Sequence, residues 1–177
     1  MNHIVLHEPL IPQNTGNVMR TCVATGARLH LIKPLGFSLE DKHVRRPALD
    51  YLRDLDYEIH DSYEAFQADR QGHFYFITRY AERSHDNHDY TGDGDVYFVF
   101  GKETTGIPKS LLKANIERCV RIPMSDKTRS LNVSNAVAIV LYEALRQQGY
   151  PGLHTHEPDI FKGKDFLKNH HGSDSND

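Results

Sequence analysis

Short runs of apolar and β-branched residues alternate with segments of helical spacing along most of the chain. The runs predict strands at 3–8, 28–33, 73–78, 96–101 and 119–123. Helices are predicted near 15–25, 47–54, 62–70, 108–115 and 132–148, because apolar spacing and Asn, Ser, Thr, Gly or Pro at their ends agree there. This alternation predicts an α/β domain with a mostly parallel sheet flanked by helices.

The predicted helix over 132–148 follows a cluster of small polar residues in the stretch RSLNVSNAVAIVLYEAL, 129–145. Asn132 or Ser130 can cap its first turn, and one cap is enough for a helix. The additional Ser134 and Asn135 leave two interpretations open, a cap with its loop or a ligand site at the end of a strand. Ile139 belongs to a second apolar face, which indicates burial in the domain or contact with another subunit.

Two other segments combine glycine with polar residues. The predicted strand VYFVFG leads directly into Lys102, Glu103 and Thr104, and this loop lacks the GxxxxGK[ST] pattern of phosphate-binding NTPases. Near the N-terminus, Asn14 or Thr15 is predicted to cap a helix that ends at 26. Taken singly, each segment is equally well explained by an ordinary turn or helix cap.

Composition narrows the classes of protein. A chain of 177 residues is long enough for about one domain, and its net charge of -3 restricts any nucleic-acid surface to a local patch. Cys22 and Cys119 form no CxxC pair, which fits a reducing compartment. The sequence contains neither a signal-peptide pattern nor an apolar run of membrane-spanning length, so we expect a cytoplasmic protein without a membrane partner.

The three polar segments, in their order along the chain, resemble the sequence motifs of the SPOUT RNA methyltransferases. The matching stretches are NTGNVMR at 14–20, FGKETTGIP at 100–108 and IPMSDKTRSLNVSNAVAIVLYEA at 122–144. Within that family the chain is most similar to the short tRNA 2′-O-methyltransferases that modify the wobble nucleotide. The similarity extends from about residue 4 to residue 152.

The resemblance implies a fold and partners that general rules do not predict. It implies a deep trefoil knot in the C-terminal part of the domain, although knots are rare in proteins. It further implies a homodimer that binds S-adenosylmethionine and the anticodon loop of tRNA, without a metal. We expect a SPOUT methyltransferase domain over 1–158 and a partly disordered polar tail over 159–177.

The resemblance also assigns residues to roles. Arg20 matches the catalytic arginine, and Asn14 and Glu103 are expected to orient Arg20 and the substrate. The expected cofactor-binding residues are Ile77, Thr78, Gly101, Gly106, Ile122, Met124, Ser130, Leu131 and Asn135. The expected RNA-binding residues are Arg45, Arg46, Lys127, Arg129 and Tyr142. Lys102 and Thr105 depart from the family, which commonly has Pro and Arg in that loop.

The expected reaction is 2′-O-methylation of cytidine or modified uridine at position 34, with leucine tRNAs as the expected substrates. A guanidinium keeps its protons in proteins, so Arg20 is expected to stabilise charge or hold a phosphate and not to act as a base. Two alternatives remain. One is a SPOUT enzyme that acts on another tRNA or rRNA site, and the other is a non-catalytic nucleotide-binding module.

Overall fold

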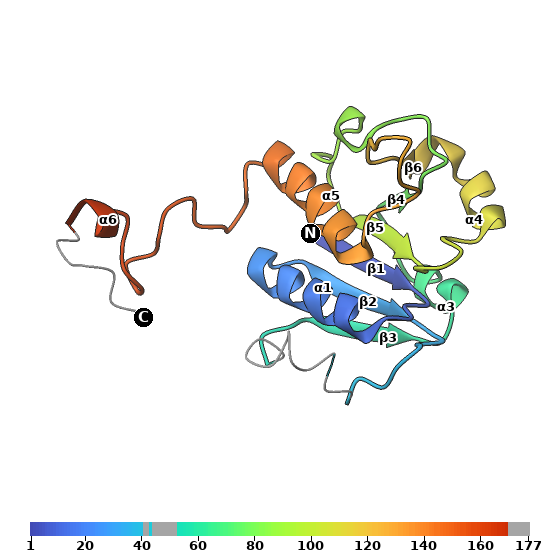
Figure 1. Ribbon diagram of the computed structural model, residues 1–177, viewed down its shortest axis with the longest axis horizontal. Helices are drawn as coiled ribbons and strands as arrows, with labels where there is room; N and C mark the ends of the chain where they lie inside the picture. The colour runs from blue at the N-terminus through green and yellow to red at the C-terminus, as the bar shows by residue number, and fades with distance from the viewer. Residues whose placement is uncertain (41–42, 44–52, 170–177) are drawn as a thin grey trace.

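The strands of the computed structural model form one parallel sheet (Figure 1). The structure describes residues 1–40, 43 and 53–169. Its strands are β1 (Asn2–His7), β2 (Arg28–Ile32), β3 (Tyr57–His60), β4 (His73–Ile77), β5 (Val96–Gly101) and β6 (Cys119–Val120). Their order across the sheet is β3-β2-β1-β5-β4-β6, and each pairing is parallel. The predicted parallel α/β architecture is confirmed.

Two strands differ from the prediction. The sequence pattern did not predict β3, because this four-residue edge strand alternates exposed and half-buried residues and has no apolar run. The strand predicted over 119–123 is only two residues long. Beyond it, the backbone N–H of Arg121 donates to the carbonyl of Arg83, and Pro123 has no N–H to continue a ladder.

The helices that pack on the sheet follow the predicted segments with one correction, and a further short helix forms in the segment predicted as a partly disordered tail. They are α1 (Pro12–Thr25), α3 (Tyr63–Gln67), α4 (Lys109–Ala114), α5 (Val133–Gln147) and α6 (Phe166–Asn169), with short 3-10 turns η1 (His85–Asn87) and η2 (Ile116–Arg118). The predicted cap at Asn14 or Thr15 is wrong, because α1 begins at Pro12 and both residues are buried inside it. Proline fits this first position since it has no N–H to leave unpaired. Gly26 ends α1 with a φ of 69°, as predicted.

The helices cover the sheet in two layers. In Figure 1, α1 and α5 lie side by side over one face, where Val18 and Leu141 join a core that includes Ile4 and Phe98. In the second core, Phe66 of α3 and Leu112 of α4 pack against the opposite face of the sheet. Alternate strand residues therefore enter different cores, so the central strands are buried on both faces.

The segment around residues 47–54 and the C-terminal tail are only partly described by the structure. Most of the helix predicted over 47–54 and the end of the tail, 170–177, lie outside the described residues. The described end of the tail forms α6, which Figure 1 places away from the sheet. The trefoil knot and the domain boundary at 158 stay predictions. Among the described residues, no helix is long and apolar enough to cross a membrane.

A row of histidines crosses the face of the sheet that α3 covers. His3 Nδ1 lies 2.9 Å from His30 Nε2, and His30 Nδ1 lies 3.1 Å from His60 Nε2. Each such pair needs one nitrogen without a proton as the acceptor, so at least one ring of each pair is neutral. Burial lowers the pKa of His3, His30 and His60, which favours the neutral form of all three rings. Burial, reinforced by the neighbouring histidines and arginines, lowers the pKa of His30 to about 3.

The row ends in an ion-pair cluster at the sheet edge. Ligand-type atoms of His30, Glu58 and His60 all lie within 4.8 Å of one another. Glu58 is already paired with Arg28, at 2.8 Å, and with Arg70. The histidine hydrogen bonds and the two ion pairs explain why these three side chains lie close together. Both arginines would repel a metal ion placed among them.

Stability is expected to fall as the pH drops below about 6.5. In the unfolded chain His30 takes up a proton near its ordinary pKa of 6.5, whereas the folded chain takes it up only near 3. The unfolded state therefore binds more protons between these values, and the free energy of unfolding falls by up to about 1.4 kcal/mol per pH unit for this group. Above pH 6.5 His30 is neutral in both states, and the free energy of unfolding no longer changes with pH through this group.

Urea unfolding between pH 7.5 and pH 5 measures this slope. The variant His30→Gln should show a smaller slope, and His156→Gln, at an exposed position, serves as the matched control. Equal slopes in the two variants would contradict the role of His30.

Candidate active site at the carboxyl ends of the strands

A chain of hydrogen bonds joins the three polar segments found in the sequence. The Glu103 carboxylate accepts hydrogen bonds from the backbone N–H groups of Leu10, at 3.0 Å, and Ile11, at 3.2 Å. It also accepts one from Asn14 Nδ2 at 3.3 Å. The Asn14 Oδ1 atom in turn accepts from Asn132 Nδ2 at 2.9 Å. Residues far apart in sequence therefore meet at one point.

Glu103 acts as a remote cap for α1. Ile11, the N-cap residue, makes no side-chain capping bond, and the first turn of α1 contains no acidic residue. A carboxylate next to a helix N-terminus is favoured by the helix dipole and by charged hydrogen bonds to N–H groups. Because its oxygens are engaged by three donors, Glu103 is fixed in place and is suited to positioning other groups.

Asn132 caps α5, as predicted, and it also joins this helix to the network. Its Oδ1 accepts from the backbone N–H of Ser134 at 2.9 Å and of Asn135 at 3.4 Å, and from the Ser134 hydroxyl at 2.6 Å. Ser134 is buried, whereas Ser130 and Asn135 are exposed. The cap therefore uses only part of the polar cluster, and Ser130 faces a cavity.

A cavity of about 730 Å³ opens where β4, β5 and β6 end. This edge of an open parallel sheet is the usual ligand position, and the volume suits a ligand of nucleoside size. Of the nine predicted cofactor residues, all but Asn135 line the cavity: Ile77, Thr78, Gly101, Gly106, Ile122, Met124, Ser130 and Leu131. Asn14, Glu103 and Arg129 line it as well.

The floor of the cavity is apolar and its loops are polar. Phe100 and Ile122 are buried there, at 1% and 9% exposure. Gly101 has a φ of 98°, and a Cβ at this position would lie 2.6 Å from the backbone oxygen of His7. Only glycine therefore lets β5 turn into the loop so close to β1. An apolar slot beside exposed backbone loops fits a cofactor with an adenine ring and polar ends.

Lys102, which departs from the family pattern, has a structural partner. Its Nζ lies 2.5 Å from Glu8 Oε2, and both side chains are about one quarter to one third exposed. Glu8 follows β1 and has a φ of 46°. The ion pair therefore connects the loops that follow the two central strands.

Arg20 is not brought to the lining of this cavity. It is exposed on α1, six residues beyond Asn14, which corresponds to a rise of about 9 Å along the helix. Glu103 bonds to Asn14 and to the backbone ahead of α1, so the predicted orientation of Arg20 by these two residues stays a prediction.

The predicted RNA-binding residues are spread over different places. Arg45 and Arg46 lie outside the described residues. Lys127 and Arg129 are exposed on the segment between β6 and α5, and Arg129 lines the cavity. Tyr142 lies on α5, 47% exposed, at a different cavity.

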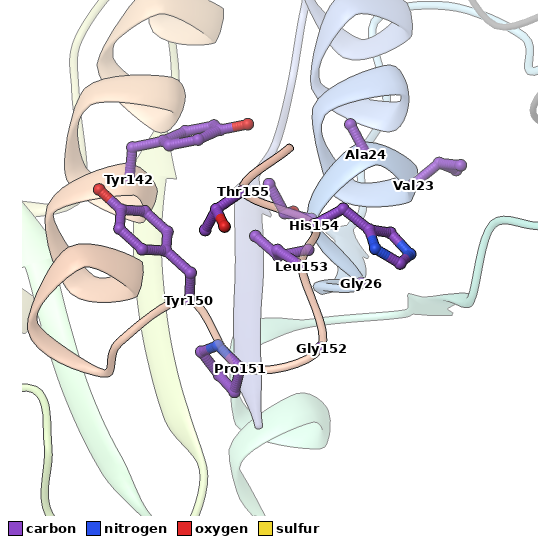
Figure 2. Close-up of a pocket in the computed structure, with 11 residues that line it drawn as sticks. Val23, Ala24, Gly26, Tyr142, Tyr150, Pro151, Gly152, Leu153, His154 and Thr155 are labelled. Atoms are coloured by element: carbon purple, nitrogen blue, oxygen red, sulfur yellow. The ribbon is translucent and has the colours of Figure 1, made fainter. Parts of the chain in front are cut away.

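That second cavity, of about 750 Å³, lies between the C-terminal half of α1, α5 and the segment 150–155 (Figure 2). Figure 2 shows Tyr142 and Tyr150 on one side and residues of α1 on the other. The sequence predicts a second apolar face on α5, and Ile139 of this helix, outside the cavity lining, is 37% exposed.

Sequence reasoning missed three residues on the rim of the first cavity, Arg79, Tyr80 and Lys109. The stretch TRYAER contains no recognisable motif. Their position in the chain was the available signal. Arg79 and Tyr80 follow a predicted strand and Lys109 begins a predicted helix, and both places lie at the ligand-binding edge of a parallel sheet.

Comparison with known proteins identifies the family. Residues 1–142 match the SpoU rRNA Methylase family. The chain is 47% identical over 154 residues to the tRNA (cytidine(34)-2'-O)-methyltransferase of Escherichia coli (strain K12), with 86% of this chain and 97% of that protein covered. A protein of Bacillus subtilis (strain 168) that bears the same name provisionally is 52% identical over 153 residues, which cover 85% and 96% of the two chains.

Solved structures agree with the sequence comparison. A structure described as giving insights into the 2-OH methylation of C/U34 on tRNA superposes with a TM-score of 0.78 at 40% identity, covering 84% of this chain and 97% of that one. The fold and the site define a methyltransferase domain of the α/β type. The chain belongs to the SpoU methylase family, and the predicted family membership is confirmed.

Removing the charge of Glu103 is expected to destabilise the protein. In Glu103→Gln, weaker hydrogen bonds to Leu10 and Ile11 should lower the free energy of unfolding by about 1–2 kcal/mol. Urea unfolding measures this loss, and Glu117→Gln, at an exposed position on η2, is the control and should change stability by less than about 0.5 kcal/mol. A Glu103→Gln variant as stable as the parent would show that this carboxylate does not cap α1.

Proposed function

We propose that this protein transfers a methyl group from S-adenosylmethionine to the ribose 2′-hydroxyl of the wobble nucleotide, cytidine or modified uridine 34, in the tRNA anticodon loop. The observation that carries the proposal is the Glu103–Asn14–Asn132 network, which gathers three motif loops around one cavity. Support also comes from relatives at 47–52% identity that match over nearly their whole length. Leucine tRNAs are the proposed substrates.

The cofactor fits the residues of this cavity. S-adenosylmethionine supplies a methyl group that its sulfonium already activates. The buried Phe100 and Ile122 offer an apolar surface for the adenine ring, and the loop at Gly101 offers backbone hydrogen-bonding groups for its polar edges. Ser130 and Leu131 close the cavity from the segment before α5.

The protein's main task is then to position the ribose. Bound S-adenosylmethionine would supply its methyl carbon to the ribose 2′-oxygen, with S-adenosylhomocysteine as the leaving group and the hydroxyl proton passing to solvent water. Glu103 holds the start of α1 beside the cavity, and α1 carries Arg20 at an exposed position further along the helix. Arg20 is proposed to stabilise the developing negative charge on the oxygen or to hold the adjacent phosphate.

We further propose that the active unit is a homodimer. Ile139 and Tyr142 are exposed on α5, and Tyr142 also lines the hollow next to α1, so a second copy would cover an apolar surface there. Arg20 lies outside the lining of its own cavity, and a partner chain is one way to bring an arginine to it. The proposed site therefore combines the cavity of one chain with Arg20 of the other.

The proposed reaction predicts where label from S-adenosylmethionine will appear. Incubation with total tRNA should place the methyl group in an alkali-resistant dinucleotide that spans position 34, because a 2′-O-methyl group blocks cleavage by the neighbouring oxygen. Leucine tRNAs should carry the label. Label on a base, or in ribosomal RNA alone, would instead support the alternative SPOUT enzymes, and absence of transfer would support a binding module.

The two-chain site predicts complementation between two inactive variants. Arg20→Ala should keep cofactor affinity and lose methyl transfer by tenfold or more, about 1.4 kcal/mol. Leu131→Arg should block the cavity with a cation, and the exposed position of Leu131 tolerates the change. Random mixing by denaturation and refolding should restore about a quarter of the parent rate, since half the dimers then hold one complete site. A mixture as inactive as its components would place Arg20 in the cavity of its own chain.

A further inference from the structure

Tyr80 stands at the mouth of the candidate active site, just beyond the end of β4. It lines the cavity described above, yet 57% of its side chain is exposed. The floor of the same cavity is formed by buried residues, so a cofactor held there would leave the Tyr80 ring accessible. A single exposed aromatic residue is ordinary on a protein surface. Its neighbours give this one significance.

Two cations flank the Tyr80 ring. The Arg79 guanidinium carbon lies 4.8 Å from the ring centroid, and Lys109 Nζ lies 5.9 Å from it. Arg79 Nη2 donates a hydrogen bond to the Tyr80 hydroxyl at 2.9 Å. Both cations are exposed, and within the described part of the chain neither pairs with a carboxylate. Their charges are therefore available to an anionic ligand.

The backbone around Tyr80 is also held in place. The Tyr80 N–H donates to the hydroxyl of Thr78 at 3.3 Å, and the Arg121 guanidinium donates to the carbonyl of Arg79. The ring is thus presented by a segment fixed to β4 on one side and to the chain beyond β6 on the other. Such preorganisation lowers the entropy cost of binding.

An exposed aromatic side chain with two cations beside its ring matches the chemistry of a nucleotide. Bases of single-stranded RNA stack on aromatic side chains, and lysine or arginine contacts their phosphates. We propose that Tyr80, Arg79 and Lys109 form a subsite that stacks a nucleobase next to the methylated nucleotide and contacts its phosphate. This inference rests on the proposed function, because a ribose at the buried cofactor would place its neighbours at the rim.

The alternative ligand for the ring is the cofactor itself. Two cations beside the ring disfavour the positively charged sulfonium, which supports the RNA assignment. The Tyr80 hydroxyl mainly holds Arg79, so a phenylalanine should still stack, whereas an alanine should not. These two substitutions separate stacking from the hydrogen bond.

The experiment measures cofactor affinity by calorimetry and steady-state methylation of tRNA for the variants Tyr80→Ala and Tyr80→Phe. Tyr57→Ala is the matched control, since Tyr57 is 40% exposed on β3 at the opposite edge of the sheet. Tyr80→Ala should raise KM for tRNA about tenfold with unchanged cofactor affinity, and Tyr80→Phe by less than about threefold. Lys109→Gln should raise KM and weaken its dependence on salt.

A fluorescent base gives a second readout. A tRNA anticodon stem-loop with 2-aminopurine beside position 34 should lose fluorescence on binding the parent protein and the Tyr57→Ala variant, and keep it with Tyr80→Ala. Loss of cofactor affinity in Tyr80→Ala, or unchanged KM and quenching, would overturn the subsite. If the parent protein methylates no tRNA, the proposed function fails; if it does and Tyr80→Ala behaves like the parent, the subsite alone fails.

Discussion

The contact of Glu103 with the start of α1 determines the geometry of the whole site. This carboxylate lies in the loop after β5, and its donors Leu10, Ile11 and Asn14 lie between β1 and α1. β1 and β5 are neighbours in the sheet, and the connections that follow them run to opposite sides of it. The hydrogen bonds of Glu103 join these two connections at the point where they diverge. Asn132 extends the same contact to α5. One acidic group thus fixes two helices and three loops relative to the strand ends.

The cavity beside this network separates two physical environments. Its floor consists of residues from β5 and from the chain after β6 that are nearly inaccessible to water, whereas its rim consists of exposed polar and charged residues. The adenine ring of a cofactor would gain binding free energy mainly by burial against the apolar floor, and an RNA phosphate mainly by contact with the charged residues of the rim. The reacting atoms would meet between them.

The sequence predicted the sheet and most of the cavity lining because both depend on local signals. Apolar runs marked the buried strands, and the glycine at 101 marked a turn for which the structure shows no space for a Cβ. The edge strand β3 and the start of α1 were missed, because one lacks an apolar run and the other is capped by distant Glu103. Tyr80 was missed because no pattern of spacing marks a rim residue. Only the start of α1 depends on a tertiary contact that no local window contains, whereas β3 and Tyr80 have no local pattern that marks them.

A chain with a net charge of -3 can bind RNA only through local concentrations of positive charge. Around the cavity these charges come from separate segments, with Arg79 after β4, Lys109 at the start of α4 and Arg129 before α5. All three segments lie at the carboxyl ends of parallel strands, so the topology itself brings them together. The fold therefore supplies what the composition lacks. A small number of phosphate contacts placed in this way would orient an RNA loop over the cavity while leaving recognition of its bases to stacking and hydrogen bonds.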